Sequence, residues 1–203
     1  ADEQTKRLST GIADHDLVLG GGVLPAGVML LAGQPGIGKS TLLLQVAAHI
    51  AQGHSVLYAS GEESASQVKL RATRLGAESG DDLQFVASTS ADDISATIRS
   101  GKYQLVIIDS IQTLSLDEIT SAPGTVSQIT NSANVIIRAA KESGAAVILV
   151  GHVTKEGSIA GPKVLEHLVD VVLHFDGVRY GGLKAVRGVK TASGSRPKAG
   201  FFG

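Results

Sequence analysis

The sequence predicts an α/β fold with a mostly parallel central sheet and helices on both faces. Short apolar segments recur along the 203 residues and alternate with longer segments of helical periodicity. Several apolar segments show no polar alternation, which is typical of strands buried on both faces. A glycine-rich turn follows the first of these segments directly and opens the first helical segment.

The strands and helices follow one another in a regular order. Six strands are expected, at residues 28–32, 55–60, 84–87, 104–109, 146–151 and 169–175. Three helices are expected, at residues 39–52, 63–75 and 125–143, and a glycine follows each of them. A further strand starts at residues 183–189. The segments 115–124 and 153–165 are long and irregular, and loops of that length are usually functional or mobile.

The composition excludes several classes of protein. With 43% hydrophobic and 18% charged residues, the chain is not a disordered one. It has no cysteine, so disulfides, thiolate zinc sites and a cysteine nucleophile are excluded. We recognise no secretory leader and no apolar stretch of the roughly 20 residues that span a bilayer, and we expect a cytoplasmic protein without membrane contact. The net charge of −1 argues against a surface that is basic overall, but it allows a local basic groove.

A phosphate-binding loop is the strongest signal. The segment GQPGIGKS at residues 33–40 matches GxxxxGK[ST] in full, between a strand and a helix. Its glycines let backbone N–H groups converge on phosphate oxygens, and the helix N-terminus favours the same anion. Lys39 can reach the β- and γ-phosphates of a bound nucleotide, the Ser40 hydroxyl can ligate Mg²⁺, and Thr41 adds an α-phosphate contact. The expected binding residues are Gly33, Gln34, Pro35, Gly36, Ile37, Gly38, Lys39, Ser40 and Thr41.

Acidic residues follow two other strands. Asp109 ends the apolar segment 105–108, and a carboxylate there would orient Mg²⁺ or its waters. An ordinary strand-end aspartate that caps a turn is the alternative. Glu62 and Glu63 follow the second strand, where a glutamate can hold the attacking water. Glu62 lies closer to the strand end and is favoured as the base, while Glu63 could instead cap the next helix.

A histidine ends the fifth predicted strand. From that position His152 could sense the γ-phosphate and pass its state to the loop that follows. A histidine held by structural hydrogen bonds is the alternative. The other histidines show no metal-ligand spacing.

Three longer segments carry a family resemblance. They are YASGEESASQVKLRATRLG at 58–76, IIDSIQTLSLDEITSAPGTVSQ at 107–128 and VGHVTKEGSIAGPKVLEHLVD at 150–170. Together with the phosphate loop they resemble the ATPase core of the bacterial RadA/Sms DNA-repair family, over residues 8–190. The resemblance implies a RecA-like P-loop core, ATP hydrolysis and a hexameric ring. It also implies binding of single-stranded or branched DNA, branch migration beside a RecA-type recombinase, and a place at the nucleoid.

The resemblance assigns roles to individual residues. Asp109 becomes the Walker B acid, and Glu62 or Glu63 the catalytic acid. The loops near residues 123–124 and 155–163 would face the central channel, where Lys155 and Lys163 would contact DNA phosphates. Solvated loop lysines are the alternative for both. Because aromatic residues are only 3% of the chain, we expect contacts to the DNA backbone rather than base readout.

The sequence also departs from the family pattern. A four-cysteine zinc finger and a protease-like domain are absent, so we expect a chain confined to the ATPase core. The family motif Lys-Asn-Arg-Phe-Gly begins correctly at Lys190, but TASG at residues 191–194 replaces the rest. In the family this Lys and Arg reach the neighbouring subunit's γ-phosphate, so Lys190 is a catalytic candidate and weak ATPase activity is expected.

The domain is accordingly expected at residues 1–190. Residues 191–203 form an atypical tail, which we attribute to a frameshift or a cloning artefact. A KaiC-like nucleotide-dependent switch or assembly module, without DNA motor activity, is the alternative function for the same phosphate loop.

Overall fold

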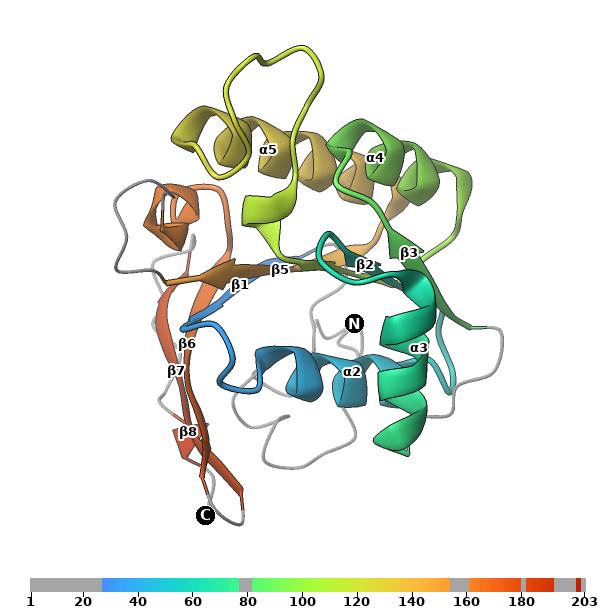
Figure 1. The fold of residues 1–203 in the computed structure, drawn as a ribbon, viewed down its shortest axis with the longest axis vertical. Coiled ribbons are helices and arrows are strands. Elements are labelled where there is room, and N and C mark those ends of the chain that lie inside the picture. The colour runs from blue at the N-terminus through green and yellow to red at the C-terminus, as the bar shows by residue number, and fades with distance from the viewer. Residues whose placement is uncertain (1–26, 77–81, 154–160, 180–181, 192–199, 202–203) are drawn as a thin grey trace, which may run out of the picture.

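A computed structural model describes residues 27–76, 82–153, 161–179, 182–191 and 200–201, and the side chains among these up to residue 175 (Figure 1). Lys155 and most of the tail beyond Thr191 lie outside the described residues. The boundary predicted at residue 190 falls at the end of the last long strand.

The centre of the fold is an eight-stranded sheet with the order β3-β2-β4-β5-β1-β6-β7-β8. The first six strands in this order are parallel, while β7 and β8 join antiparallel at one edge. The predicted, mostly parallel RecA-like core is therefore confirmed, and each of the six predicted strands is present. Their bounds are β1 Val28–Gly33, β2 Val56–Ser60, β3 Leu83–Ala87, β4 Leu105–Asp109, β5 Ala146–His152, β6 Val171–Arg179, β7 Gly182–Thr191 and β8 Gly200–Phe201.

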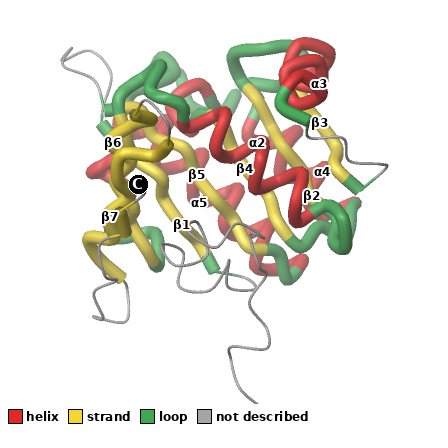
Figure 2. The backbone as a smooth tube through the Cα atoms, turned by 90° about the horizontal axis from the view of Figure 1, so that it is seen from below, coloured by secondary structure: helices red, strands yellow, loops and turns green. Residues whose placement is uncertain are grey.

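Helices cover both faces of the sheet, as predicted. On one face lie α2 (Lys39–Ile50) and α3 (Ala65–Arg74), and on the other lie α4 (Ala91–Ser100) and α5 (Val126–Ser143) (Figures 1 and 2). Two short 3₁₀ helices, η2 (Ile111–Thr113) and η3 (Pro162–Leu165), follow β4 and β5. Among the helices that the structure describes, none has both the length and the apolar character needed to cross a membrane.

The helix α4 was not predicted from the sequence. Its apolar stripe is short, because only Ile94 and Ile98 are large buried side chains on it. Asp92 and Asp93 occupy its first turn, and the Ser90 side chain caps it by accepting from the Asp93 N–H at 3.1 Å. Packing against α5 and the sheet therefore stabilises a helix whose own periodicity is weak.

The parallel strands are buried on both sides. In β4, Leu105 and Ile107 pack towards α2 and α3, while Val106 and Ile108 pack towards α4 and α5. All four side chains are fully buried. This two-sided burial explains why the strand segments show no polar alternation.

The register of the sheet places the polar strand ends at one edge. Ser60 of β2 pairs with Asp109 of β4, and Gly33 of β1 pairs with His152 of β5. Since β2, β4, β5 and β1 are consecutive neighbours, these four residues lie along the carboxyl edge of the sheet. Ligands of open α/β sheets bind at this edge.

Candidate nucleotide-binding site

A cleft of about 540 Å³ opens at the carboxyl edge of the sheet. Its walls are the phosphate loop with the start of α2, the turn after β2, the helix η2 and the end of β5. The volume suits a small-molecule ligand of nucleotide size. The structure thus brings together the four segments that the sequence analysis singled out separately.

Glycine is required at three positions of the phosphate loop. Gly36 and Gly38 have positive φ angles of 77° and 104°, which side chains rarely adopt. A Cβ at Gly33 would lie 2.7 Å from the Phe175 carbonyl oxygen. No side chain caps the N-terminus of α2 at Gly38, so the first turn of the helix presents its N–H groups to an anion in the cleft.

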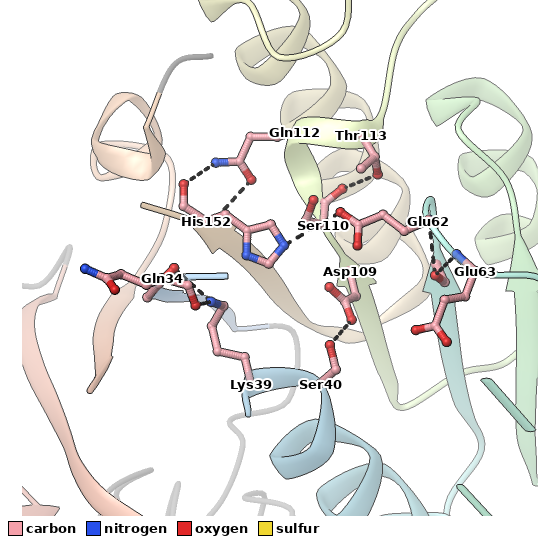
Figure 3. A network of polar contacts seen from close by, with 12 residues as sticks. Gln34, Lys39, Ser40, Glu62, Glu63, Asp109, Ser110, Gln112, Thr113 and His152 are labelled. Atoms are coloured by element: carbon pink, nitrogen blue, oxygen red, sulfur yellow. Dashed lines mark hydrogen bonds and ion pairs between the residues drawn. The ribbon is translucent and has the colours of Figure 1, made fainter. Parts of the chain in front are cut away.

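Lys39 lies folded against the loop that precedes it. Its ammonium donates to the carbonyl oxygens of Gly33 at 2.8 Å and Gln34 at 2.5 Å, and the residue is only 3% exposed (Figure 3). Burial lowers the pKa of Lys39 to about 8, although the charges of Asp109 and Glu62 oppose the shift. Because both of its hydrogen-bond partners are neutral carbonyls, an anionic phosphate beside the ammonium would stabilise its charged form.

Asp109 receives two hydrogen bonds on a single carboxylate oxygen. The Ser40 Oγ and the Tyr58 hydroxyl both donate to Asp109 Oδ2 at 2.6 Å. Tyr58 is fully buried in β2, and burial, followed by the charge of Asp109, raises its pKa well above 10, so the phenol remains a donor. Tyr58 was not predicted as a site residue, because its hydroxyl lies in the middle of a strand that is apolar up to Ser60 at its end.

Ser40 and Asp109 provide the donors that the predicted Mg²⁺ requires. A hydroxyl and a carboxylate lie in contact at the foot of the phosphate loop, and both are hard oxygen ligands. Within the described ranges, no group of three or more His, Asp and Glu side chains is arranged to hold a metal ion. The donor set therefore fits an ion that keeps phosphate oxygens and waters as its remaining ligands.

The two glutamates have different surroundings. Glu63 forms an ion pair with Arg71 of α3, with Oε1 and Nη1 3.0 Å apart. The helix cap that was considered for Glu63 is instead Ser64, which forms a capping box with Gln67. Glu62 points towards His152 in Figure 3, with 3.9 Å between its Oε1 and Nε2 of the ring. Within the described structure, Glu63 is thus paired with an arginine, whereas Glu62 is not.

The electrostatics favour Glu62 as a base. Partial burial, and then the charges of Asp109 and Glu63, raise the pKa of Glu62 above its ordinary value. Burial and the charge of Lys39 lower the pKa of His152, so its ring is neutral at pH 7. The Glu62–His152 contact is therefore not an ion pair at neutral pH.

His152 is held through its backbone, not through its ring. The side-chain amide of Gln112 accepts from the His152 N–H at 3.1 Å and donates to the His152 carbonyl at 2.8 Å. The buried ring Nδ1 has no hydrogen-bond partner among the described atoms. The Nδ1 edge is thus buried and unpaired, while the Nε2 edge is the one that faces Glu62.

Other predicted residues lie away from this cleft, and some lining residues were not predicted. Lys163 is exposed on η3 and does not line the cleft. The backbone of Lys190 lies in β7, paired with Val172 of β6. Arg71 and Gln112 line the cleft and were missed, because each lies in a segment whose pattern indicates only a helix or a turn.

Comparison with known proteins agrees with this geometry. Residues 2–158 match the AAA domain family. The protein named DNA repair protein RadA in Pseudomonas aeruginosa is 47% identical over 201 residues, covering 99% of this chain and 44% of that protein. The RadA proteins of Halalkalibacterium halodurans and Listeria monocytogenes are 49% and 48% identical, over 98% and 100% of this chain and 44% of each relative.

Fold, cleft and domain match together define a P-loop protein of the AAA class with a RecA-like core. The chain belongs to the RadA/Sms family. It spans less than half the length of these curated relatives.

Binding of a nucleoside triphosphate at pH 8.5 should be accompanied by proton uptake. The pKa of Lys39 is about 8 in the folded protein, and anionic phosphates beside the ammonium will raise it. Calorimetric titrations in two buffers of different ionisation enthalpy measure this uptake. Lys39→Arg is the control, because a guanidinium stays charged at this pH. Equal heats in both buffers for the unaltered protein would contradict the prediction.

Tyr58→Phe should raise the Mg²⁺ concentration needed for triphosphate binding by about tenfold. One hydrogen bond to the Asp109 carboxylate is lost, while the ring keeps its packing. Titrating Mg²⁺ against a fluorescent nucleotide analogue checks this, and binding without Mg²⁺ should not change. Tyr103→Phe is the matched control, since that hydroxyl bonds Gln84 away from the cleft. The same Mg²⁺ dependence in both variants would show that Tyr58 has no part in holding Asp109.

Proposed function

We propose that this chain is an ATP-hydrolysing motor domain that binds single-stranded DNA and acts in recombinational DNA repair, including branch migration. One observation carries the proposal. The phosphate-loop residues Lys39 and Ser40, the Asp109 carboxylate, Glu62 and His152 line or adjoin a single cleft. The names of the relatives support a role in DNA repair.

Each side chain has a part in hydrolysis. The loop N–H groups and Lys39 hold the β- and γ-phosphates, while Ser40 and Asp109 would hold Mg²⁺, which neutralises phosphate charge when bound. Glu62 orients a water and takes its proton as the oxygen bonds to the γ-phosphorus and the β–γ bridge bond breaks. A raised pKa improves Glu62 as a base near neutral pH. The neutral His152 ring faces the same γ-phosphate position.

The proposed DNA contacts are unevenly distributed between the two loops. The segment 115–124 contains no lysine or arginine, and it exposes Asp117 and Glu118. Attraction to phosphates therefore has to come from the other loop, where Lys155 and Lys163 remain the proposed contacts. For residues 123–124 we therefore propose only uncharged contacts with DNA.

Assembly belongs to the same proposal. We infer a hexameric ring in which Lys190 reaches the γ-phosphate bound by the neighbouring subunit, acting on branched DNA beside a RecA-type recombinase at the nucleoid of a bacterial cytoplasm. The family relationship supports this inference. Because the finger arginine is absent from residues 191–194, we expect slow turnover.

Glu62→Gln should lower the ATPase rate at least 100-fold and leave ATP binding intact, because the amide cannot take a proton. Glu63→Gln is the matched control and should keep the rate within a fewfold, since Glu63 pairs with Arg71. The rate of the unaltered protein should fall as the pH drops through the raised pKa of Glu62, above the ordinary 4.5. Steady-state assays from pH 4.5 to 8 measure both effects. A larger loss in Glu63→Gln would reverse the assignment.

Single-stranded DNA should raise the ATPase rate, and Lys163→Ala should weaken DNA binding and flatten its salt dependence. Lys141→Ala, which changes an exposed lysine on α5, is the control. Turnover is measured against DNA concentration at several salt concentrations, with particle size followed in parallel. Nucleotide-dependent assembly without salt-sensitive DNA affinity would favour the KaiC-like switch instead.

A further inference from the structure

Gln112 joins two parts of the molecule that the sequence separates by 40 positions. Its side-chain amide bonds both polar backbone groups of His152, with a 2.8 Å bond to the carbonyl and a 3.1 Å bond from the N–H (Figure 3). We propose that Gln112 is a positioning residue, which fixes His152 relative to Glu62 and couples the cleft to the segment 115–124. The inference rests on the proposed ATPase function of the same cleft.

The two hydrogen bonds between the Gln112 side chain and the His152 backbone take the place of strand pairing beyond the end of β4. At the start of β5, the N–H of Ala146 donates to Gln104 on the β4 side, whereas the N–H of Val153, just after β5, donates to Gly33 on the β1 side. Because backbone groups alternate along a strand, those of His152 point towards β4. The last residue of β4, however, is Asp109, which pairs with Val150. The Gln112 amide supplies the acceptor and the donor that a continuing β4 strand would have offered to His152.

The neighbour of Gln112 holds the opposite wall of the cleft. Thr113 packs so closely under Gly61 that a Cβ at Gly61 would lie 2.0 Å from its Oγ1. The Gly61 N–H also donates to the Asp109 carbonyl at 3.0 Å. Gly61 precedes Glu62, so two adjacent residues of η2 position the two side chains that approach to 3.9 Å across the cleft. The separation of Glu62 and His152 therefore depends on both of these contacts with η2.

The segment after η2 is firmly attached to the fold. Ser115 exchanges backbone hydrogen bonds with Thr89 and Ala91, at 2.9 and 3.0 Å. The amide of Gln128, which is 1% exposed on α5, accepts from the Leu116 N–H at 2.9 Å and donates to the carbonyls of Ile119 and Ser121 at 3.0 and 2.8 Å. Residues 115–121 are therefore bonded at both ends, and a movement of His152 can reach them through Gln112 and η2.

Gln112→Leu tests the proposal, because leucine has a similar volume and neither donor nor acceptor. The matched control is Gln104→Leu, which also removes a side-chain bond to backbone, the 2.7 Å bond from the Ser55 N–H outside the cleft. Three quantities are measured for each protein. They are the affinity for a non-hydrolysable ATP analogue, kcat and KM for ATP, and hydrogen exchange of residues 115–124 with and without the analogue.

We expect Gln112→Leu to bind the analogue within about twofold of the unaltered protein and to lose about tenfold or more in kcat, with little change in KM. Analogue binding should slow exchange in residues 115–124 of the unaltered protein and of Gln104→Leu, but not of Gln112→Leu. A role confined to stability would instead lower the melting temperature and weaken binding together, and that result overturns the proposal.

The exchange measurement on the unaltered protein needs no variant to fold. If the analogue binds and the exchange of residues 115–124 does not change, the proposed coupling is wrong. If the unaltered protein neither binds nor hydrolyses ATP, the proposed function fails as well. If it does both while Gln112→Leu behaves like Gln104→Leu, only the role of Gln112 is overturned.

Discussion

The site depends on one carboxylate oxygen. Asp109 Oδ2 accepts from Ser40 at the start of α2 and from Tyr58 in β2, and its own backbone belongs to β4. These bonds connect the phosphate loop to two neighbouring strands inside a nearly dry interior, where Asp109 is 6% exposed. A buried charge is costly unless hydrogen bonds satisfy it, so the loss of either donor should disturb the Asp109 carboxylate and, with it, the proposed Mg²⁺ site.

Burial and close charges also shift the pKa values of the side chains around the cleft. Burial lowers the pKa of Lys39 and raises that of Glu62, and the two side chains also act on each other through their charges. His152 is kept neutral by burial and by the nearby ammonium. One edge of a parallel sheet therefore provides a cation with neutral partners, a carboxylate with a strengthened basicity and an uncharged ring. Groups whose pKa values are pushed in different directions are typical of active sites.

The sequence was informative where local pattern and chemistry coincide. The phosphate loop, the apolar strands and the polar strand ends could be predicted, because a parallel sheet brings all carboxyl ends to one edge. Tyr58 and Gln112 could not be predicted as site residues, since their partners are set by strand register and by the point at which β4 ends. The helix α4 was missed because its stability comes from packing. The choice between Glu62 and Glu63 required the position of Arg71, which lies on α3 eight residues after Glu63.

Two glutamines, not charged residues, organise the connection between the cleft and the surface. A neutral amide can offer a donor and an acceptor to backbone groups without the desolvation cost of a charge, which suits buried positions such as those of Gln112 and Gln128. Because the segment 115–124 has only acidic charges, it is poorly suited to attract DNA by itself. Its extensive anchoring makes better sense if it transmits movement between the cleft and basic residues elsewhere. In that arrangement the nucleotide state and the proposed DNA contact would be linked through backbone geometry, and the proposed electrostatic attraction would come from the loop that follows β5.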